Sequence, residues 1–280
     1  MSTTTTGTAP SRRPRAPWAD ALGGLWSGNA GSVLGRNLRS ARSTTWLIVV
    51  TGFFEPVFYL LAMGIGLGRY IGDVQTSTGA TVSYAAFIAP ALLAVSAMNG
   101  AVYDSTWNVF FKMHFGKLYD AMLATSLGPL DVALGEISYA LLRGALYAGG
   151  FLTVMAAMGL TSSWGALLAL PAAVLVAFGF ASLGMAITSY MKTFQQMDWI
   201  NFVMLPMFLF SATFYPVTVY PGPVQGLVKA LPLWHGVELI RGLTTGALTP
   251  ALWGHVAYYV VMIALGVTFT TRRLRTMFLE

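Results

Sequence analysis

The sequence contains no cysteine, which excludes disulfide bonds, thiolate metal sites and cysteine nucleophiles. It is also poor in charge: 9% of its residues are Asp, Glu, Lys or Arg, against about 25% in soluble domains. So few charges cannot cover the surface of a water-soluble globule of 280 residues, and 56% of the residues are hydrophobic. This composition suits a lipid bilayer, and we predict an all-α integral membrane protein.

Motifs for enzymatic chemistry are missing as well. There is no phosphate-binding G-x-x-x-x-G-K-[ST] loop, no H-E-x-x-H pair and no serine in a nucleophile elbow. The three histidines, His114, His235 and His255, are far apart and fall on different predicted sides of the membrane, so we expect no shared metal centre. The net charge of +6 is scattered and gives no reason to expect a nucleic-acid partner. We therefore expect no catalytic residue, cofactor or metal in this chain.

Six segments are apolar and long enough to cross a bilayer core, which takes about 20 residues at 1.5 Å each. Tyr or Trp lies near the ends of these segments, as is typical of the membrane–water interface. The predicted spans are Thr44–Leu67, Tyr84–Tyr103, Tyr139–Gly159, Trp164–Tyr190, Trp199–Tyr220 and Leu252–Thr271.

The basic residues give these spans a direction. If the N-terminus is cytoplasmic, 12 of the 16 Lys and Arg residues fall on the inner side, and Arg69, Lys229 and Arg241 fall outside. Arg143 lies within a span, where we expect it to reach the interface, with pairing to Glu136 or Asp131 as the alternative. The excess of inner charge predicts that both termini are cytoplasmic and that the chain lies in the cell membrane.

The first 43 residues precede the predicted spans. Residues 1–29 are rich in Ser, Thr, Gly and Pro and are predicted to be a flexible cytoplasmic tail. Residues 30–43 are predicted to form an amphipathic interfacial helix, with a solvated turn before the first span as the alternative. One arc of that helix carries Val33, Leu34, Leu38 and Ala41, and the opposite arc carries Arg36, Arg39 and Arg42. Residues 44–280 are predicted to be one transmembrane domain.

The connection at residues 104–137 is too long for a turn and is cytoplasmic in this topology. Within it, Asn108–Ala124 carries an apolar stripe at helical spacing, which needs a surface to cover it. A groove on a partner protein and the chain's own bundle or membrane face are equally good candidates for that surface. The stripe consists of Phe110, Phe111, Phe115, Leu118 and Met122, and the polar remainder includes Lys112, His114, Lys117, Tyr119 and Asp120.

The external connection at residues 221–250 is apolar but is interrupted by four prolines. Its two apolar stretches, Val224–Leu231 and Gly236–Leu243, are each too short to span the bilayer. We predict a re-entrant or interfacial helical hairpin, packed against the spans because non-spanning backbone at membrane depth has to be shielded. Glu238 and Arg241 are spaced to form an ion pair on its second helix, which is either a surface pair or part of a gate.

One acidic residue, Glu55, lies in the middle of the first predicted span and precedes Pro56. A bare carboxylate there costs a few kcal/mol, so it should face the bundle, pair or be protonated. It is either a substrate or gating site or a structural contact beside the kink at Pro56.

Three stretches resemble the permeases of ABC-2 type exporters, and most closely those of drug and lipo-oligosaccharide exporters, such as the exporters of anthracyclines and nodulation factors. The resemblance covers the chain from about Ser43 to the C-terminus. Its motifs are M-L-A-T-S-L-G-P-L-D-V-A-L-G-E-I at Met122–Ile137, F-S-A-T-F-Y-P at Phe210–Pro216 and L-P-L-W-H-G-V-E-L-I-R-G-L at Leu231–Leu243.

The resemblance implies a six-span permease of the type V exporter kind, with an interfacial N-terminal helix. It implies a second permease copy or a sister permease, packed through the fifth span, and two copies of a separate cytoplasmic ATP-binding subunit that holds ATP and Mg. It favours docking of Asn108–Ala124 on that subunit. The implied coupling residues are Phe110, Phe111, Lys112, His114, Phe115, Gly116, Lys117 and Asp120.

The predicted function is export of an amphipathic drug, lipid or glycolipid from the cytoplasm or the inner leaflet. The candidate residues for translocation or gating are Glu55, Phe210, Phe214, Tyr215, Glu238 and Arg241. The alternatives are a membrane-embedded lipid-modifying enzyme, which needs polar residues clustered at one face, and an ion-coupled secondary transporter, which needs several intramembrane acids.

Overall fold

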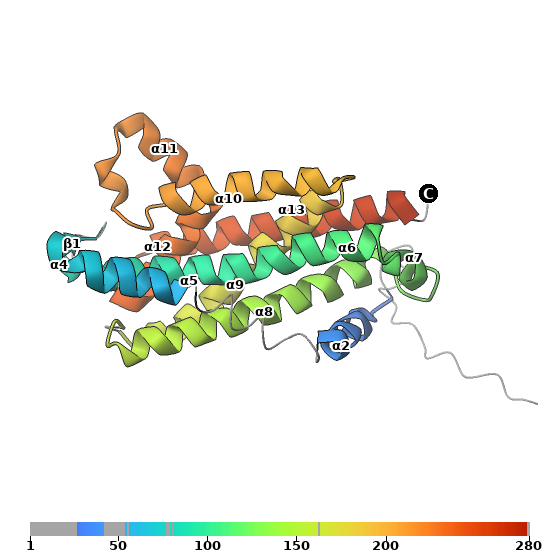
Figure 1. Ribbon diagram of the computed structural model, residues 1–280, viewed down its shortest axis with the longest axis horizontal. Helices are drawn as coiled ribbons and strands as arrows, with labels where there is room; N and C mark the ends of the chain where they lie inside the picture. Colours follow the sequence, from blue (N-terminus) through green and yellow to red (C-terminus); the bar gives the residue numbers. More distant parts are fainter. Residues whose placement is uncertain are drawn as a thin grey trace, which may run out of the picture.

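The structure, a computed structural model, describes residues 27–41, 54, 56–76, 79, 81–161 and 163–278. These residues form a bundle of helices that run side by side along one axis (Figure 1). α2 (Ala30–Ala41), α7 (Leu118–Leu123) and the end of α13 (Ala251–Phe278) lie at one end, which we call the α7 end. The opposite end, here the α12 end, carries α4 (Gly68–Ile71) and α12 (Pro232–Thr245).

Within the described residues, four helices are long and apolar enough to cross a membrane. The first, Tyr84–His114, consists of α5 (Tyr84–Tyr103), a π-helical turn η2 (Asp104–Asn108) and α6 (Val109–His114). The others are α8 (Pro129–Ala157), α9 (Ala166–Thr188) and α13. Four of the six predicted spans are thus confirmed as helices of membrane-crossing length, and the chain is a mostly helical membrane protein.

Small residues at the helix crossings of the bundle core let the helices approach closely. α5 is central, and most of its residues are buried. A Cβ added to Gly144 of α8 would lie 2.9 Å from the Cβ of Ala177 on α9 and 3.1 Å from the carbonyl oxygen of Ala97 on α5. Small residues at such crossings are typical of membrane helix bundles, in which van der Waals contact between helices supplies much of the association energy.

The other two predicted spans are not confirmed as helices of membrane-crossing length. The fifth, predicted at Trp199–Tyr220, is helical only as α10 (Asp198–Phe210), which is about 20 Å long and shorter than a bilayer core. The chain then leaves the helix through Ala212, whose φ is 56°, and forms the 3-10 turn η4 (Val217–Val219). Of the first, the structure describes an apolar helix at Pro56–Ile71, including the π-helical η1 (Leu60–Leu67). Residues 42–53 and Glu55 lie outside the described residues, so the count of six spans stays a prediction.

Short elements connect the long helices. A small antiparallel hairpin, β1 (Asp73–Gln75) and β2 (Thr81–Ser83), joins α4 to α5 and pairs Val74 with Val82; the sequence analysis did not predict it. The 3-10 turn η3 (Phe194–Met197) leads into α10.

The segment at residues 221–250 contains two short helices, as predicted, at α11 (Gly222–Ala230) and α12. α12 lies within the bundle against α5, α9 and α13. Its Gly236 permits the contact, because an added Cβ would lie 2.6 Å from the hydroxyl oxygen of Tyr259 on α13. The packing of α12 against the long helices therefore agrees with expectation, while the re-entrant hairpin and its depth in a bilayer stay predictions.

Candidate functional site

The predicted coupling segment Asn108–Ala124 is not one continuous helix. α6 ends at His114, and the amide of Gly116 donates back to the carbonyl of Phe111 at 2.9 Å. Lys117 then adopts a left-handed conformation, with φ at 43°, before α7 begins. Helical periodicity across this turn was therefore the wrong assumption, because the turn changes the direction of the chain.

The break divides the apolar stripe into two sets. Phe110 and Met122 are buried, which fits packing against the chain's own bundle. Phe111 and Phe115 are 45% and 68% exposed, and their ring centroids are 5.4 Å apart. Leu118 is also exposed. We call Phe111, Phe115 and Leu118 the aromatic corner, the part of the stripe that the described residues leave uncovered.

The carboxylate of Glu136 on α8 binds Lys112, which follows Phe111 of this corner in α6. Its side chain is only 2% exposed, and it accepts hydrogen bonds from Lys112 Nζ at 2.6 Å, Asn37 Nδ2 at 2.9 Å and Arg36 at 3.3 Å. These donors come from α6 and α2, so one buried carboxylate joins three helices. A buried acid is tolerated because it is paired and hydrogen-bonded. The sequence analysis did not predict this cluster. The charged residues Lys112 and Glu136, on otherwise apolar helices, were the signal that could have indicated it.

A second carboxylate of α8, Asp131, accepts hydrogen bonds from the residues that precede α2. Its oxygens accept from the Ser27 amide and hydroxyl at 2.7 Å each, from the Asn29 amide at 2.9 Å and from the Gly128 amide at 2.9 Å. Asp131 therefore satisfies backbone donors ahead of α2 as well as the N-cap of its own helix.

The predicted interfacial helix 30–43 is present as α2, but it faces differently from expectation. Its buried residues, Val33 and Asn37, pack on α8, whereas Leu38 of the predicted apolar arc is exposed. Arg36 pairs with Glu136 instead of facing lipid, because this buried acid is within its reach. Arg39 is exposed, and Arg42 lies outside the described residues.

Arg143 pairs within the bundle, although the sequence analysis expected its side chain to extend to the membrane interface. Its guanidinium nitrogen lies 2.6 Å from Oδ1 of Asp104 on η2, and its side chain is 9% exposed. Asn108 donates to the same oxygen, and Tyr147 accepts from the guanidinium at 3.2 Å. The predicted alternative partners, Glu136 and Asp131, are instead engaged with α2. Arg143 pairs with Asp104 because η2 continues the central helix and so places Asp104 at the level of Arg143.

The ion pair predicted between Glu238 and Arg241 is present at 2.5 Å, and it is buried rather than on the surface. The Arg241 guanidinium also donates to the carbonyl oxygens of Ala212 at 2.9 Å and Phe87 at 3.3 Å. It lies 4.1 Å from the centroid of the Phe87 ring. Arg241 thus fixes the point where α10 ends against α5 and α12, and burial lowers its pKa, although the carboxylate of Glu238 opposes that shift.

The remaining gate candidates lie around the same point. The Phe214 ring packs 5.2 Å from Phe208, and the Tyr215 hydroxyl lies 2.9 Å from that of Tyr220. Phe210 is 46% exposed at the end of α10. The structure brings these three residues and the Glu238–Arg241 pair to one region of the α12 end; Glu55 lies outside the described residues.

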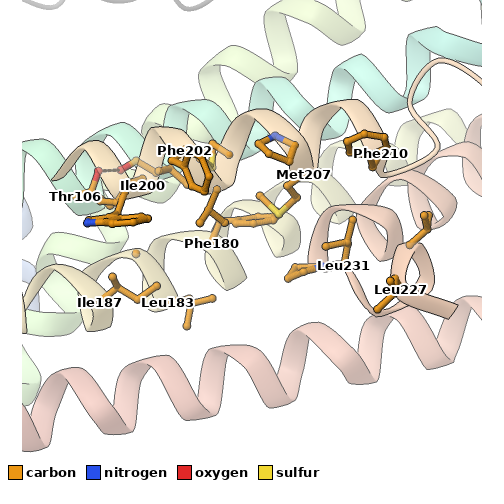
Figure 2. Close-up of a pocket in the computed structure, with 18 of the residues that line it drawn as sticks. Thr106, Phe180, Leu183, Ile187, Ile200, Phe202, Met207, Phe210, Leu227 and Leu231 are labelled. Atoms are coloured by element: carbon orange, nitrogen blue, oxygen red, sulfur yellow. Dashed lines mark hydrogen bonds between the residues drawn. The ribbon is translucent and has the colours of Figure 1, made fainter. Parts of the chain in front are cut away.

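An apolar groove of about 670 Å³ runs between α10 and α9 (Figure 2). Phe202 and Met207 of α10 line it together with Leu183 and Ile187 of α9, and Phe210 lies at the end nearest Leu227 and Leu231. α11 contributes Leu227 and Val228 at the other end of the groove. The hydroxyl of Thr106, at the wall, donates to the carbonyl of Val102 at 2.7 Å. The groove therefore offers a surface for hydrocarbon and almost no free polar group.

The prediction that the three histidines lie far apart is wrong for two of them: α12 packs on α13, and the Nδ1 atoms of His235 and His255 lie 2.8 Å apart. Among the residues that the structure describes, no three His, Asp or Glu side chains are grouped to hold a metal ion.

Comparisons with known proteins give the family. The ABC-2 type transporter family matches residues 30–244. Nodulation protein J of Rhizobium leguminosarum bv. trifolii is 33% identical over 222 residues, which are 79% of this chain and 83% of that protein. Nodulation protein J of Rhizobium meliloti is 29% identical over 85% of this chain and 91% of its own length. The inner membrane transport permease YadH of Escherichia coli is 27% identical over 68% of this chain and 71% of its own length. The chain therefore belongs to the ABC-2 type transporter family and is a membrane-embedded transport permease.

Proposed function

We propose that this chain is the permease subunit of an exporter for amphipathic molecules, driven by ATP hydrolysis on a separate cytoplasmic subunit. The family and the permease relatives support transport, and the sequence contains no phosphate-binding loop that would place ATP on this chain. The observation that carries the proposal is the aromatic corner: exposed aromatic rings at the end of the helix that forms the core of the bundle.

The mechanical argument starts from that helix. Tyr84–His114 is 31 residues long, so at 1.5 Å per residue it is about 46 Å from end to end. Its far part is buried on nearly all sides, and the aromatic corner extends directly from its near end. A force applied to Phe111 and Phe115 would therefore act on the centre of the bundle.

The hydrogen bonds between Lys112, Glu136 and Asn37 would transmit such a movement to neighbouring helices. Lys112 follows Phe111 and is bonded to Glu136 of α8, which also holds Asn37 of α2. A shift of α6 would therefore move α8 and α2 with it, or break bonds to a buried carboxylate. We propose that the ATP-binding subunit docks on the aromatic corner and that this cluster transmits its motion; on this basis the α7 end and both termini are cytoplasmic.

The substrate class follows from the apolar groove. Its walls are apolar over the length of α10, and the one hydroxyl at its wall is bonded to backbone. A polar molecule would lose its hydrogen bonds to water there and find no replacement, whereas a hydrocarbon has no such bonds to lose. We propose that the groove receives the apolar part of the substrate while its polar part stays toward an end of the bundle.

A second permease copy is proposed at α10. Only Met207 of this helix is buried, and Trp199, Phe202 and Leu205 are each more than 60% exposed. A helix with so little burial gains little from its own bundle, so packing against another copy or a sister permease would stabilise it.

The test replaces Phe111 and Phe115 together by serine in the complete exporter. We expect membrane insertion to persist while drug-stimulated ATP hydrolysis, measured with an anthracycline as the probe, falls to the unstimulated rate. The matched control is Trp253→Ser, because Trp253 is 76% exposed at the opposite end of the bundle. Stimulation equal to wild type in the double variant would refute the coupling role of the corner.

A further inference from the structure

A pair of histidines joins α12 to α13. His235 lies in the first turn of α12 and His255 near the beginning of α13, and their Nδ1 atoms are 2.8 Å apart. A neutral imidazole carries one N–H and one bare nitrogen, so a contact between the same atom of two rings requires one ring to donate and the other to accept. The number of protons on the pair therefore determines whether this contact can form.

Aromatic neighbours hold both imidazole rings in this arrangement. The ring of His235 stacks on that of Tyr258, with the centroids 3.9 Å apart. The centroid of the His255 ring lies 5.2 Å from that of Trp234. Turning either imidazole away from the other would break one of these ring contacts, so the packing of α12 on α13 keeps the two Nδ1 atoms facing each other.

Two successive protons have opposite effects on the contact. The first can bind a nitrogen outside the contact, which leaves one N–H between the rings and makes that hydrogen bond charge-assisted. A second would place an N–H on both Nδ1 atoms. Two facing donors cannot stay 2.8 Å apart, because neither nitrogen then offers a lone pair to the other. The closed pair therefore takes up one proton at most, whereas two separated imidazoles take up two.

The surrounding charges do not compensate a second positive charge on the pair. The nearby acid on α12 is Glu238, which is already paired with Arg241. Lys229 of α11 lines the same cavity as Glu238 and adds a positive charge. Tyr258 and Tyr259 of α13 are neutral in acidic solution. α5 and α9, which also pack on α12, contain no Asp, Glu, Lys, Arg or His.

Opening of the contact therefore becomes easier as the pH falls. A solvent-exposed imidazole has a pKa of about 6.5, and burial together with the neighbouring His255 lowers the pKa of His235 to about 4. The contact is fully stabilising above about pH 6.5 and loses stability below it, because the open form binds more protons than the closed form. One additional proton in the open form favours opening about 30-fold at pH 5 relative to pH 7.5.

We propose that the His235–His255 pair is a pH-sensitive switch, which holds α12 against α13 in neutral solution and releases it in mildly acidic solution. α12 also carries Arg241, which donates to the carbonyl of Ala212 where α10 ends. Release of α12 would therefore loosen the region that contains the gate candidates. The switch is a property of this chain alone and needs neither ATP nor a partner subunit, so it and the proposed function can fail independently.

The experiment is hydrogen–deuterium exchange of the complete chain in phosphatidylcholine nanodiscs at pH 7.5 and pH 5, with each rate corrected for the intrinsic pH dependence of exchange. In the wild-type chain we expect the protection of α12 to fall at least about 30-fold at pH 5, while the core of α5 stays protected. Equal protection of α12 at the two pH values would overturn the proposal.

Single variants distinguish a coupled pair from two histidines that titrate separately. His235→Asn and His255→Asn each keep an acceptor oxygen in the place of Nδ1 but remove one titrating ring. The switch requires a wild-type pH effect larger than the product of the two single-variant effects, because facing N–H groups arise only when both imidazoles are present. A wild-type effect equal to that product would mean that the two rings titrate independently, and it would overturn the proposal.

The third histidine provides the matched control. His114 lies on α6, and its Nε2 is 2.9 Å from the carbonyl oxygen of Met191, away from the pair. His114→Asn should therefore leave the pH effect on α12 as it is in the wild-type chain. A His114→Asn chain in which α12 no longer responds to pH would assign the effect to the wrong residues and overturn the proposal.

Discussion

The packing of α2 on α8 gives a quantitative prediction at a single glycine. A Cβ added to Gly135 would lie 2.4 Å from the Cβ of Val33 and 2.9 Å from the carbonyl oxygen of Ala30. Real Cβ atoms do not come this close to backbone or to a branched side chain, so Gly135→Ala must push α2 away from α8. Overpacking of this kind costs about 1–3 kcal/mol.

The same substitution elsewhere in α8 supplies the control. A Cβ on Gly149 would have its nearest neighbour at 3.9 Å, on the flexible side chain of Leu170. Gly149→Ala should therefore be neutral or stabilise the helix by about 0.5–1 kcal/mol, because alanine favours helix over glycine. Gly135→Ala gains the same propensity, so the difference between the two variants isolates the clash with α2.

Hydrogen–deuterium exchange of residues 27–41 is the assay. A loss of about 1–3 kcal/mol in docking corresponds to exchange that is roughly 5- to 150-fold faster in α2, with the core of α5 unchanged. Equal exchange of α2 in Gly135→Ala and Gly149→Ala would refute the close packing of these helices.

Four further predictions follow from other contacts. Arg143→Met should destabilise the bundle by about 3–5 kcal/mol, because it leaves Asp104 buried and unpaired, and Asp104→Leu in the same chain should restore most of the loss in a thermal melt. Asp131→Ala should accelerate exchange of the Ser27 and Asn29 amides without affecting α9, since it removes their acceptor. Phe202→Cys, as the single cysteine of a chain that has none, should form a disulfide between two copies in oxidised membranes, whereas Trp164→Cys should not, although Trp164 is the more exposed residue. Arg241→Met should lower the melting temperature and expose Phe210–Pro216 to protease, because it releases the carbonyl of Ala212.

The long apolar helices were predictable from sequence because lipid solvation demands some 20 apolar residues in a row, whatever they pack against. The pair Glu238–Arg241 was predictable for a similar reason, since an i, i+3 spacing on a helix determines proximity by itself. Length and local spacing are properties of one segment, and these were the features that the sequence analysis described correctly.

The partners of Arg143 and Glu136 were not predictable, because each depends on how far one helix continues past another. η2 extends the central helix beyond Tyr103 and so carries Asp104 to Arg143. The end of α6 at His114 is likewise set by a backbone turn at Lys117 that an apolar stripe does not reveal. The exposure of only part of that stripe, which underlies the proposed docking surface, appears only once the turn is placed.

The central claim is that energy for transport comes from another chain that binds this permease. The most direct measurement is affinity purification of the tagged complete chain from its own membranes in a mild detergent, followed by mass spectrometry and an ATP hydrolysis assay. The account predicts an equimolar ATP-binding subunit in the preparation and its loss from the Phe111→Ser, Phe115→Ser variant. A wild-type chain that purifies without that subunit and still transports in proteoliposomes without ATP would contradict it.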